Sequence, residues 1–579
     1  MKTNYTNEKN VQILIALLKV HGIKKVIVSP GATNVTFVGS IQNDSFFELF
    51  SAVDERSAAY MACGLAAETG EPVVISCTGA TASRNYLSGL TEAFYRKLPI
   101  LAITSTQDIS RVGHHLPQVI DRSTIQNDVA KLSVLLPSVK DEDGIWECEL
   151  KINKAILELK RNGGGPVHIN LTTTYSQVYD VKVLPSVRKI ERITIVDEYP
   201  LLNGTIGIIV GSHRVWSKEL ENLLDKFCYV NNAVVFCDHT SSYKGKYRVL
   251  FPLVGCQESF DNSLSPDIVI HIGEITGDYY NMGYRAKQIW RVSEDGEIRD
   301  TYRKLRYLFE MPEQTFFSHY TNQNNSPSDS YLQKCRAKLK DLYNKIPELP
   351  LSNIWLASKM ASRIPQNSTI HFAILNSLRS WNFFELPHTV IANCNVGGFG
   401  IDGGLSTLIG ASLANKDRLY FCVIGDLAFF YDMNVLGNRH LSKNLRILLV
   451  NNGKGTEFRQ YKHLASQFGD EADEFIAAAG HFGNKSIELV KHYAQDLGFD
   501  YISASNKQQV EDSMEIFLNE RITDNPILFE VFTNSEDESN ALEAIMNLDI
   551  NVKGKVQELA KKAIGEVGKN AIKRIIGKA

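Results

Sequence analysis

The chain has 579 residues, enough for about three domains of typical size. Hydrophobic residues make up 44% and charged residues 22%, with a net charge of −3, which is typical of a globular protein and gives no sign of a nucleic-acid partner. The first apolar run, residues 11–20, is too short and too helical in period for a signal peptide or a membrane span. Nine scattered cysteines without a CxxC pair indicate reduced, buried thiols, so we expect a cytoplasmic protein.

The first third of the chain alternates apolar runs of helical and of strand character. Such a succession of βα units predicts a doubly wound parallel sheet. Helices are predicted at residues 11–20, 55–68 and 82–96, and strands at 25–29, 47–53, 73–77, 100–105 and 166–171.

Two loops in this region follow a strand and open a helix, residues 29–34 (SPGATN) and 78–81 (TGAT). Glu55 stands at another helix start, after the strand at 47–53. Acidic residues are common at helix N-termini for dipole and capping reasons, so Glu55 has either that structural role or a functional one. Both interpretations stay open from the sequence.

Residues 113–118 (GHHLPQ) form a further loop of interest. His114 and His115 could donate a proton near neutral pH. A solvated pair of loop histidines is the alternative interpretation.

The middle of the chain predicts a second α/β unit. The strand at 205–211 ends in Gly211-Ser212-His213 without a GxGxxG pattern, so we expect no dinucleotide. Residues 175–195 and the polar residues 321–330 are predicted linkers, the second of them mobile. The other strands of this unit are predicted at 233–237, 266–272 and 288–292.

The last α/β unit begins near Ser352, with strands at 369–372 and 390–392. The second strand runs into a glycine-rich segment, residues 393–404 (NCNVGGFGIDGG), where backbone can approach a ligand closely. The helix predicted after it, at 406–414, would direct its N-terminus toward a phosphate group.

Two further strands, at 419–424 and 446–450, each end in polar residues. Gly425-Asp426 follows the first and Asn451-Asn452 follows the second. Ligands bind at the carboxyl ends of parallel strands, so a carboxylate and an amide oxygen are expected side by side. These oxygens suit Mg²⁺ shared with a phosphate. Two ordinary strand-to-helix turns are the alternative.

The spacing from Gly425-Asp426 to Asn451-Asn452 is similar to the signature by which thiamine diphosphate enzymes hold Mg²⁺ and the cofactor's diphosphate. The first third resembles their pyrimidine-binding domain through SPGATN, VDERSAAYMACGLA and CTGATASRNYLSGLTEAFYRKLPILAITSTQ. The glycine-rich segment, GDLAFFYDMNVL and NSL resemble the menaquinone-pathway branch, which forms 2-succinyl-5-enolpyruvyl-6-hydroxy-3-cyclohexene-1-carboxylate. The resemblance covers most of residues 10–540.

This resemblance implies thiamine diphosphate and Mg²⁺ as cofactors and assigns residues to roles. Glu55 would hydrogen-bond the pyrimidine ring and exchange a proton with it, Gln118 would face the substrate, and Ile401 would hold the cofactor in its bent shape. The implied catalytic residues are Glu55, Gln118, His114 and His115. The implied metal ligands are Asp426, Asn452 and the Lys454 carbonyl. The implied cofactor-binding residues are Gly31, Thr78, Gly79, Asn85, Asn376, Ser377, Gly398, Phe399, Ile401, Gly425, Leu427, Ala428, Asn452, Lys454 and Gly455.

The resemblance further implies three doubly wound α/β domains in a homodimer or homotetramer, with the site between subunits. We assign residues 1–180 to the pyrimidine domain, 195–320 to a central domain and 352–545 to the diphosphate domain. The implied activity is decarboxylation of a 2-oxo acid followed by addition to a carbonyl acceptor, as in acetolactate synthase-like carboligases. A simple 2-oxo acid decarboxylase and a non-catalytic scaffolding homologue stay open as alternatives.

The sequence departs from the menaquinone-pathway branch at four arginines that bind substrate carboxylates there. By motif, these positions carry neutral residues here, so we expect a small monocarboxylic donor such as pyruvate and an acceptor that is an aldehyde or ketone. Arg84, Arg111 or Arg379 could supply a replacement cation. The four positions are Thr33, Gln107, Trp381 and Val396.

Residues 549–579 fall outside the resemblance and predict a basic amphipathic helix. Such a tail can lie on an anionic membrane, but more often it packs on its own protein or its dimer mate.

Overall fold

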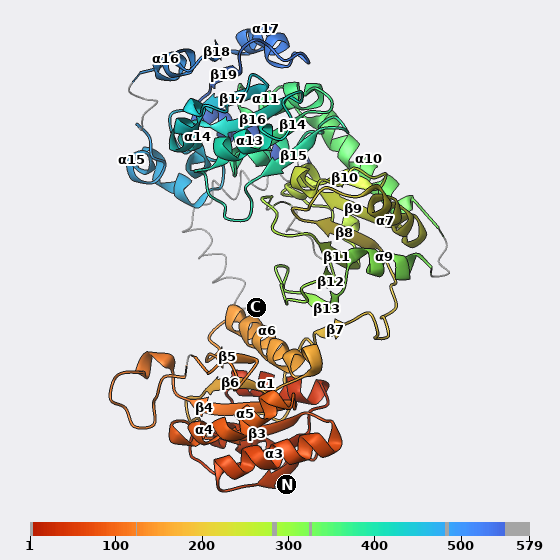
Figure 1. Ribbon diagram of the computed structural model, residues 1–579, viewed down its shortest axis with the longest axis vertical. Coiled ribbons are helices and arrows are strands. Elements are labelled where there is room, and N and C mark those ends of the chain that lie inside the picture. The colour runs from red at the N-terminus through yellow and green to blue at the C-terminus, as the bar shows by residue number, and fades with distance from the viewer. Residues whose placement is uncertain are drawn as a thin grey trace, which may run out of the picture. The chain divides into compact units, whose positions relative to one another are not determined.

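The structure is a computed structural model that describes residues 4–122, 124–278, 280, 286–322, 327–480 and 486–549 (Figure 1). The chain forms two compact units. The first comprises Met1–Tyr199 and Asp295–Glu310, and the second comprises Pro200–Glu294 and Met311–Ala579. The predicted tail helix, and residues 323–326 of the linker predicted at 321–330, lie outside the described residues.

A six-stranded parallel sheet organises the first unit, in the order β2-β1-β3-β4-β6-β5. Its inner strands β3, β4 and β6 are buried throughout, as expected for parallel strands covered on both faces. The strands are β1 (Lys25–Val28), β2 (Glu48–Ser51), β3 (Val73–Cys77), β4 (Ile100–Thr106), β5 (Leu132–Leu136) and β6 (Val167–Thr172).

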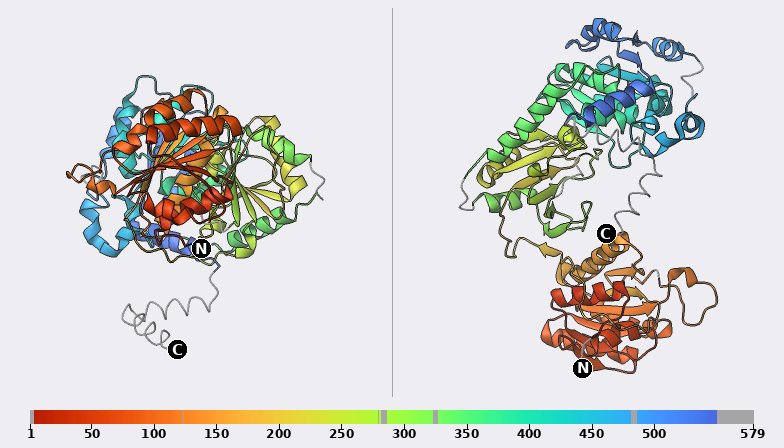
Figure 2. Two further views of the ribbon diagram at one scale, coloured as in Figure 1. Left: turned by 90° about the horizontal axis from the view of Figure 1, so that it is seen from below. Right: turned by 180° about the vertical axis from the view of Figure 1, so that it is seen from behind.

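Helices cover both faces of this sheet (Figure 2). Val74 packs with α1 and α6 on one face, while its neighbours Val73 and Ile75 pack with α3 and α5 on the other, because successive side chains of a strand alternate. The helix predicted at 82–96 is instead two helices that divide at Tyr86. The helices are α1 (Lys9–Val20), α2 (Val35–Ile41), α3 (Glu55–Thr69), α4 (Thr81–Asn85), α5 (Leu87–Tyr95) and α6 (Glu142–Glu158).

The segment predicted as a linker at 175–195 contains structure of its own. Val181 bridges antiparallel to Tyr5, and β7 (Glu191–Ile193) pairs in parallel with β13 (Leu305–Glu310). Residues 295–310, which include β13, belong to the first compact unit. The three-residue length of β7 explains why its periodicity gave no strand signal.

The second unit contains the parallel strands β10-β9-β8-β11-β12. Four of them agree with the sequence expectation, and the short strand β10 was not predicted. The strands are β8 (Ile206–Val210), β9 (Ala233–Cys237), β10 (Arg248–Leu250), β11 (Ile268–Ile272) and β12 (Gln288–Ser293); the accompanying helices are α7 (Lys218–Asn231), α8 (Pro252–Gly255), α9 (Glu313–Thr321) and α10 (Ser330–Lys345).

The second unit also contains a six-stranded parallel sheet in the order β15-β14-β16-β17-β19-β18 (Figure 1). Its strands are β14 (Thr369–Phe372), β15 (Ile391–Cys394), β16 (Tyr420–Gly425), β17 (Leu445–Asn451), β18 (Asp500–Ala504) and β19 (Ile527–Phe532). Its helices are α11 (Asn353–Met360), α12 (Asn376–Trp381), α13 (Gly404–Ser412), α14 (Asp426–Asp432), α15 (Ala472–Phe475), α16 (Leu489–Asp496), α17 (Lys507–Phe517) and α18 (Ser535–Met546).

Three sheets with only parallel pairing, interleaved with helices, confirm the predicted three-domain α/β class. The particular boundaries assigned to the three domains stay a prediction. Among the described residues, no helix is both long and apolar enough to cross a membrane. All nine cysteines are free thiols, and only Cys394 is more than slightly exposed.

Candidate active site

The register of two neighbouring strands brings Asp426 and Asn452 together. Strand β16 pairs in parallel with β17, with Ile424 opposite Leu449 and Gly425 opposite Val450. Asp426 begins α14 directly after β16, and Asn452 follows the end of β17. The carboxylate and the amide therefore stand at the same edge of the sheet, where open α/β sheets bind ligands.

A cavity of about 170 Å³ opens at this edge. It gathers most of the residues that the sequence assigned to the cofactor's diphosphate and to the metal. Gly398 and Phe399 do not line it, although Phe399 has a left-handed backbone with φ of 55°. The predicted residues that line the cavity are Asn376, Ser377, Ile401, Gly425, Asp426, Leu427, Ala428, Asn452, Lys454 and Gly455.

The chemistry of the cavity wall fits a hard cation. Asp426 is only 2% exposed, and the buried Oδ1 of Asn452 has no hydrogen-bond partner within the described residues. A buried oxygen without a donor costs free energy that a bound cation would offset. The Lys454 ammonium pairs with Asp473 at 2.5 Å. The Lys454 carbonyl oxygen accepts one long hydrogen bond of 3.4 Å from Thr456 Oγ1 and keeps a lone pair for a metal.

Within the described ranges, no cluster of three or more His, Cys, Asp or Glu side chains is placed to hold a metal ion. A metal at this edge would therefore combine the Asp426 carboxylate with amide, main-chain and phosphate oxygens. That donor set is typical of Mg²⁺ and is unlike the nitrogen and sulfur sets of zinc.

The structure adds residues to the cavity that sequence reasoning missed. Glu538 of α18 is buried, and burial raises the pKa of its carboxyl to about 7 although Asn353 N donates to it at 3.0 Å. Glu457 accepts a hydrogen bond of 2.5 Å from Arg379 Nη1. Glu538 lies more than 100 positions from Asp426 in the chain, so no local motif connects the two.

In the first unit, Glu55 and Asn85 come together. Asp54 is the N-cap of α3, since its side chain accepts from Arg56 N at 3.0 Å. Glu55 is therefore not needed for capping, and its Oε2 instead accepts from Asn85 Nδ2 at 3.1 Å. The residue predicted for the pyrimidine ring, Glu55, and the predicted cofactor-binding residue Asn85 thus form one hydrogen-bonded pair.

The loops at 29–34 and 78–81 are tied to each other. Thr33 and Thr78 have their hydroxyl oxygens 2.5 Å apart, and Gly79 N donates to Thr33 Oγ1 at 3.0 Å. A Cβ at Gly31 would lie 2.6 Å from Thr78 Cβ, and one at Gly79 would lie 2.9 Å from the carbonyl oxygen of Ser105. Close backbone packing therefore requires glycine at both positions.

The loop that carries the paired histidines is exposed. His114, His115 and Gln118 all lie at the surface of the first unit, and His115 and Gln118 have positive φ angles of 55° and 62°. The carbonyl of Gln118 packs beside Gly79, where an added Cβ would approach it to 3.3 Å. This contact places the loop beside the predicted pyrimidine site; the roles of the three side chains stay predictions.

Comparison with known proteins assigns the class. The family model described as "Thiamine pyrophosphate enzyme, N-terminal TPP binding domain" matches residues 9–125, the stretch that carries Glu55, Gly79 and Gln118. The parallel α/β fold and this match define a thiamine diphosphate-dependent enzyme.

Several full-length relatives carry one name, 2-succinyl-5-enolpyruvyl-6-hydroxy-3-cyclohexene-1-carboxylate synthase. The protein of Bacteroides fragilis is 30% identical over 562 residues, which covers 93% of this chain and 98% of the relative. That of Bacteroides thetaiotaomicron is 30% identical over 561 residues with the same coverage, and that of Desulfotalea psychrophila is 27% identical over 540 residues, covering 89% and 96%. The chain belongs to this family, the menaquinone-pathway branch of the thiamine diphosphate enzymes.

Proposed function

We propose that the protein is a thiamine diphosphate- and Mg²⁺-dependent carboligase that decarboxylates a 2-oxo acid and adds the remaining acyl unit to a carbonyl acceptor. The observation that carries the proposal is the cavity in which Asp426 and the unpartnered Oδ1 of Asn452 meet Ile401. A non-catalytic homologue has no need of a buried, unsatisfied oxygen, because that oxygen only costs stability.

In this proposal, Asp426, Asn452 and the Lys454 carbonyl hold Mg²⁺, and Ser377 and Gly455 in the same wall contact the diphosphate. Bound thiamine diphosphate supplies the electron acceptance that allows loss of CO₂. Glu55, oriented by Asn85, exchanges a proton with the pyrimidine ring. We further propose that the protein is cytoplasmic and that Glu55 of one subunit acts with Asp426 of another in a homodimer or homotetramer.

The donor substrate is proposed to be a small monocarboxylic 2-oxo acid such as pyruvate. The relatives are named for a product that carries succinyl and carboxylate groups, so we infer that their active sites accommodate carboxylates. The four positions at which this chain departs from the branch offer no positive charge. Trp381 is fully buried and donates to Asn353 Oδ1 at 3.1 Å, and Val396 is buried as well. The Thr33 hydroxyl is already hydrogen-bonded to the Thr78 hydroxyl and to Gly79 N.

Arg379 and Arg111 are poor replacements for the positive charge that is missing at these four positions. Arg379 forms an ion pair with Glu457 at 2.5 Å, which offsets its positive charge. Arg111 lies at the surface and donates to Gln107 Oε1 at 2.7 Å, the side chain at one of the four departures. An exposed guanidinium binds a substrate carboxylate weakly, because water screens the interaction. This supports a donor with one carboxylate over 2-oxoglutarate.

Steady-state CO₂ release from pyruvate and from 2-oxoglutarate tests this proposal, with and without aldehyde or hydroxyketone acceptors. We expect turnover of pyruvate that depends on added thiamine diphosphate and Mg²⁺, and a product that incorporates the acceptor. Acetaldehyde as the sole product would identify a simple decarboxylase. A preference for 2-oxoglutarate would contradict the donor assignment, and cofactor binding without turnover of any 2-oxo acid would contradict the enzymatic proposal. Asp426→Ala is the inactive control.

A further inference from the structure

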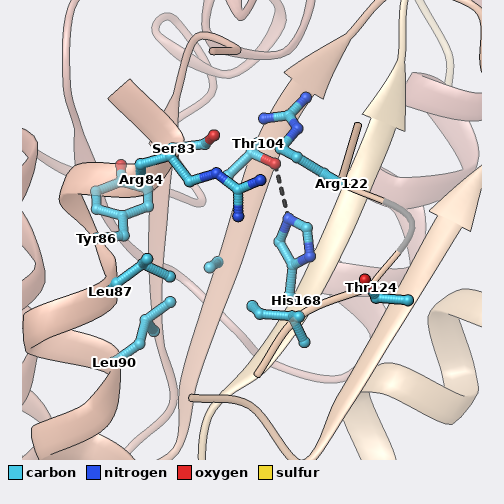
Figure 3. A pocket seen from close by; sticks show the side chains of 11 residues that line it. Ser83, Arg84, Tyr86, Leu87, Leu90, Thr104, Arg122, Thr124 and His168 are labelled. Carbon is cyan, nitrogen blue, oxygen red and sulfur yellow. Dashed lines mark hydrogen bonds between the residues drawn. The ribbon is translucent and has the colours of Figure 1, made fainter. Parts of the chain in front are cut away.

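A small polar cavity in the first unit lies outside the site described above. Its volume is about 20 Å³, and its wall combines Ser83, Arg84, Thr104, Arg122 and His168 with apolar side chains (Figure 3). A single water-sized particle requires roughly 10–15 Å³, so the cavity admits a monatomic ion or one end of a carboxylate and excludes a diphosphate.

Arg122 is the unusual member of this wall. Arg122 is only 7% exposed, and within the described residues its one hydrogen bond runs from Nη2 to the carbonyl oxygen of Ser105 at 2.9 Å. The buried Nε and Nη1 atoms have no hydrogen-bond partner in the described part of the chain. Burial lowers the pKa of Arg122 to about 10, so the guanidinium is still charged at neutral pH.

None of the described residues that line the cavity is acidic. His168 is hydrogen-bonded to Thr104 and has its pKa lowered by burial to about 3, so its ring is neutral. Cys77 has its pKa raised to about 12 and is a neutral thiol. Arg84, whose Nη2 donates to the carbonyl oxygen of Asp121 at 3.0 Å, adds a second positive charge that opposes the first.

Carboxylates of the described residues leave this charge unpaired. No carboxylate among the described residues forms an ion pair with Arg84 or Arg122. Glu55 lies close enough for its charge to raise the pKa of Cys77, but its carboxylate accepts a hydrogen bond from Asn85 instead. A buried guanidinium without a counter-charge is costly, since it loses hydration and gains no partner. An anion in the cavity would restore both.

We propose that the cavity formed by Arg84, Thr104 and Arg122 is a binding site for a small singly charged anion, either a free halide ion or the carboxylate of a small organic acid. The unpaired Nε–H and Nη1–H groups of Arg122 and the Arg84 guanidinium supply the positive charge. The inference rests on the charge and size of this cavity and does not depend on the proposed reaction.

Bromide is a direct probe, because its anomalous scattering locates it in a crystal. Crystals of the full chain soaked in sodium bromide should show an anomalous peak within contact distance of the Arg122 guanidinium. A soak in bromide plus pyruvate separates the two sources. Loss of the peak would identify a carboxylate as the competing ligand, and retention would identify a free halide; both outcomes support an anion site. Absence of a peak at Arg122, in crystals that bind bromide elsewhere, would overturn the proposal.

Solution measurements give an independent test. Titration with bromide from a halide-free buffer should raise the melting temperature of the wild type by mass action, and Arg122→Gln should lose this specific response. Arg446→Gln is the matched control. Arg446 is also buried, and burial lowers its pKa to about 10 as well, but its Nη1 and Nη2 donate to the carbonyl oxygens of Lys443, Leu445 and Arg521 and leave only Nε without a partner among the described residues. It should keep the wild-type bromide response. Equal responses in wild type and Arg122→Gln would overturn the assignment.

Discussion

Replacing Asn452 by leucine separates the cost of the predicted metal site from its benefit. The buried Oδ1 of Asn452 has no hydrogen-bond partner among the described residues, and such an atom costs about 1–3 kcal/mol. Leucine has a similar shape and no polar atom. Without cofactor and Mg²⁺, Asn452→Leu is therefore expected to be more stable than the wild type by up to about that amount.

With thiamine diphosphate and Mg²⁺ the order should reverse. A ligand present at 100 times its dissociation constant stabilises a protein by about 2.7 kcal/mol, and a variant that has lost a metal ligand loses most of this increment. Urea-induced unfolding, followed through the transition that responds to the cofactor, measures both effects. The diagnostic result is a gain in the free energy of unfolding without cofactor and a loss with it.

Asn444→Leu provides the matched control. Asn444 also has a buried Oδ1 that no described residue contacts by a hydrogen bond, but its Nδ2 donates to the carbonyl oxygens of Asn415 and Arg418 at 3.1 and 2.8 Å. Its replacement should lower stability in both conditions by about 1–3 kcal/mol and leave the cofactor response unchanged. If Asn452→Leu keeps the full cofactor-induced increment, the assignment of Asn452 as a metal ligand is wrong.

Three further predictions follow from the same structure. Glu55→Gln should bind cofactor normally but slow exchange of its thiazolium proton with deuterium by at least about 100-fold, the usual scale for loss of a general acid–base; a wild-type exchange rate measured by NMR would contradict the role. Gly31→Ala should destabilise the first unit by about 1–3 kcal/mol in a thermal melting experiment, because its Cβ would lie 2.6 Å from Thr78 Cβ. The control Gly64→Ala, at an open position in α3, should be neutral or stabilising in the same experiment. Burial lowers the pKa of His239 to about 3, so this side chain stays neutral in the folded chain, whereas in the unfolded chain it takes up a proton below pH 6.5. His239 should therefore lower the free energy of unfolding by about 1.4 kcal/mol per pH unit as the pH drops from 6.5 toward 3. In an acid titration, the stability of His239→Gln should show a slope that is shallower by one proton, and an unchanged slope would refute the assignment.

Much of the fold could be predicted from local patterns. Short, branched apolar runs such as β9 and β16 are buried on both faces, and that environment leaves a clear signature in the sequence. Asp426 and Asn452 could be placed together because each follows the carboxyl end of a parallel strand. The exposed histidine loop, in contrast, has no such constraint, and the roles of its side chains stay predictions.

Long-range partners depended on the tertiary structure. The sequence left two interpretations of Glu55 open, and the folded chain assigns the cap to Asp54, because only the backbone geometry decides which side chain reaches the free N–H groups. Glu538 of the last described helix lines the cavity that contains Asp426 and Asn452. The charge of Arg122, which no described carboxylate pairs, could be recognised only from its neighbours in the folded chain. Hydrophobic periodicity determines which segments form strands and helices, but burial, and with it the charge state of a side chain, is set by residues that are distant in the sequence.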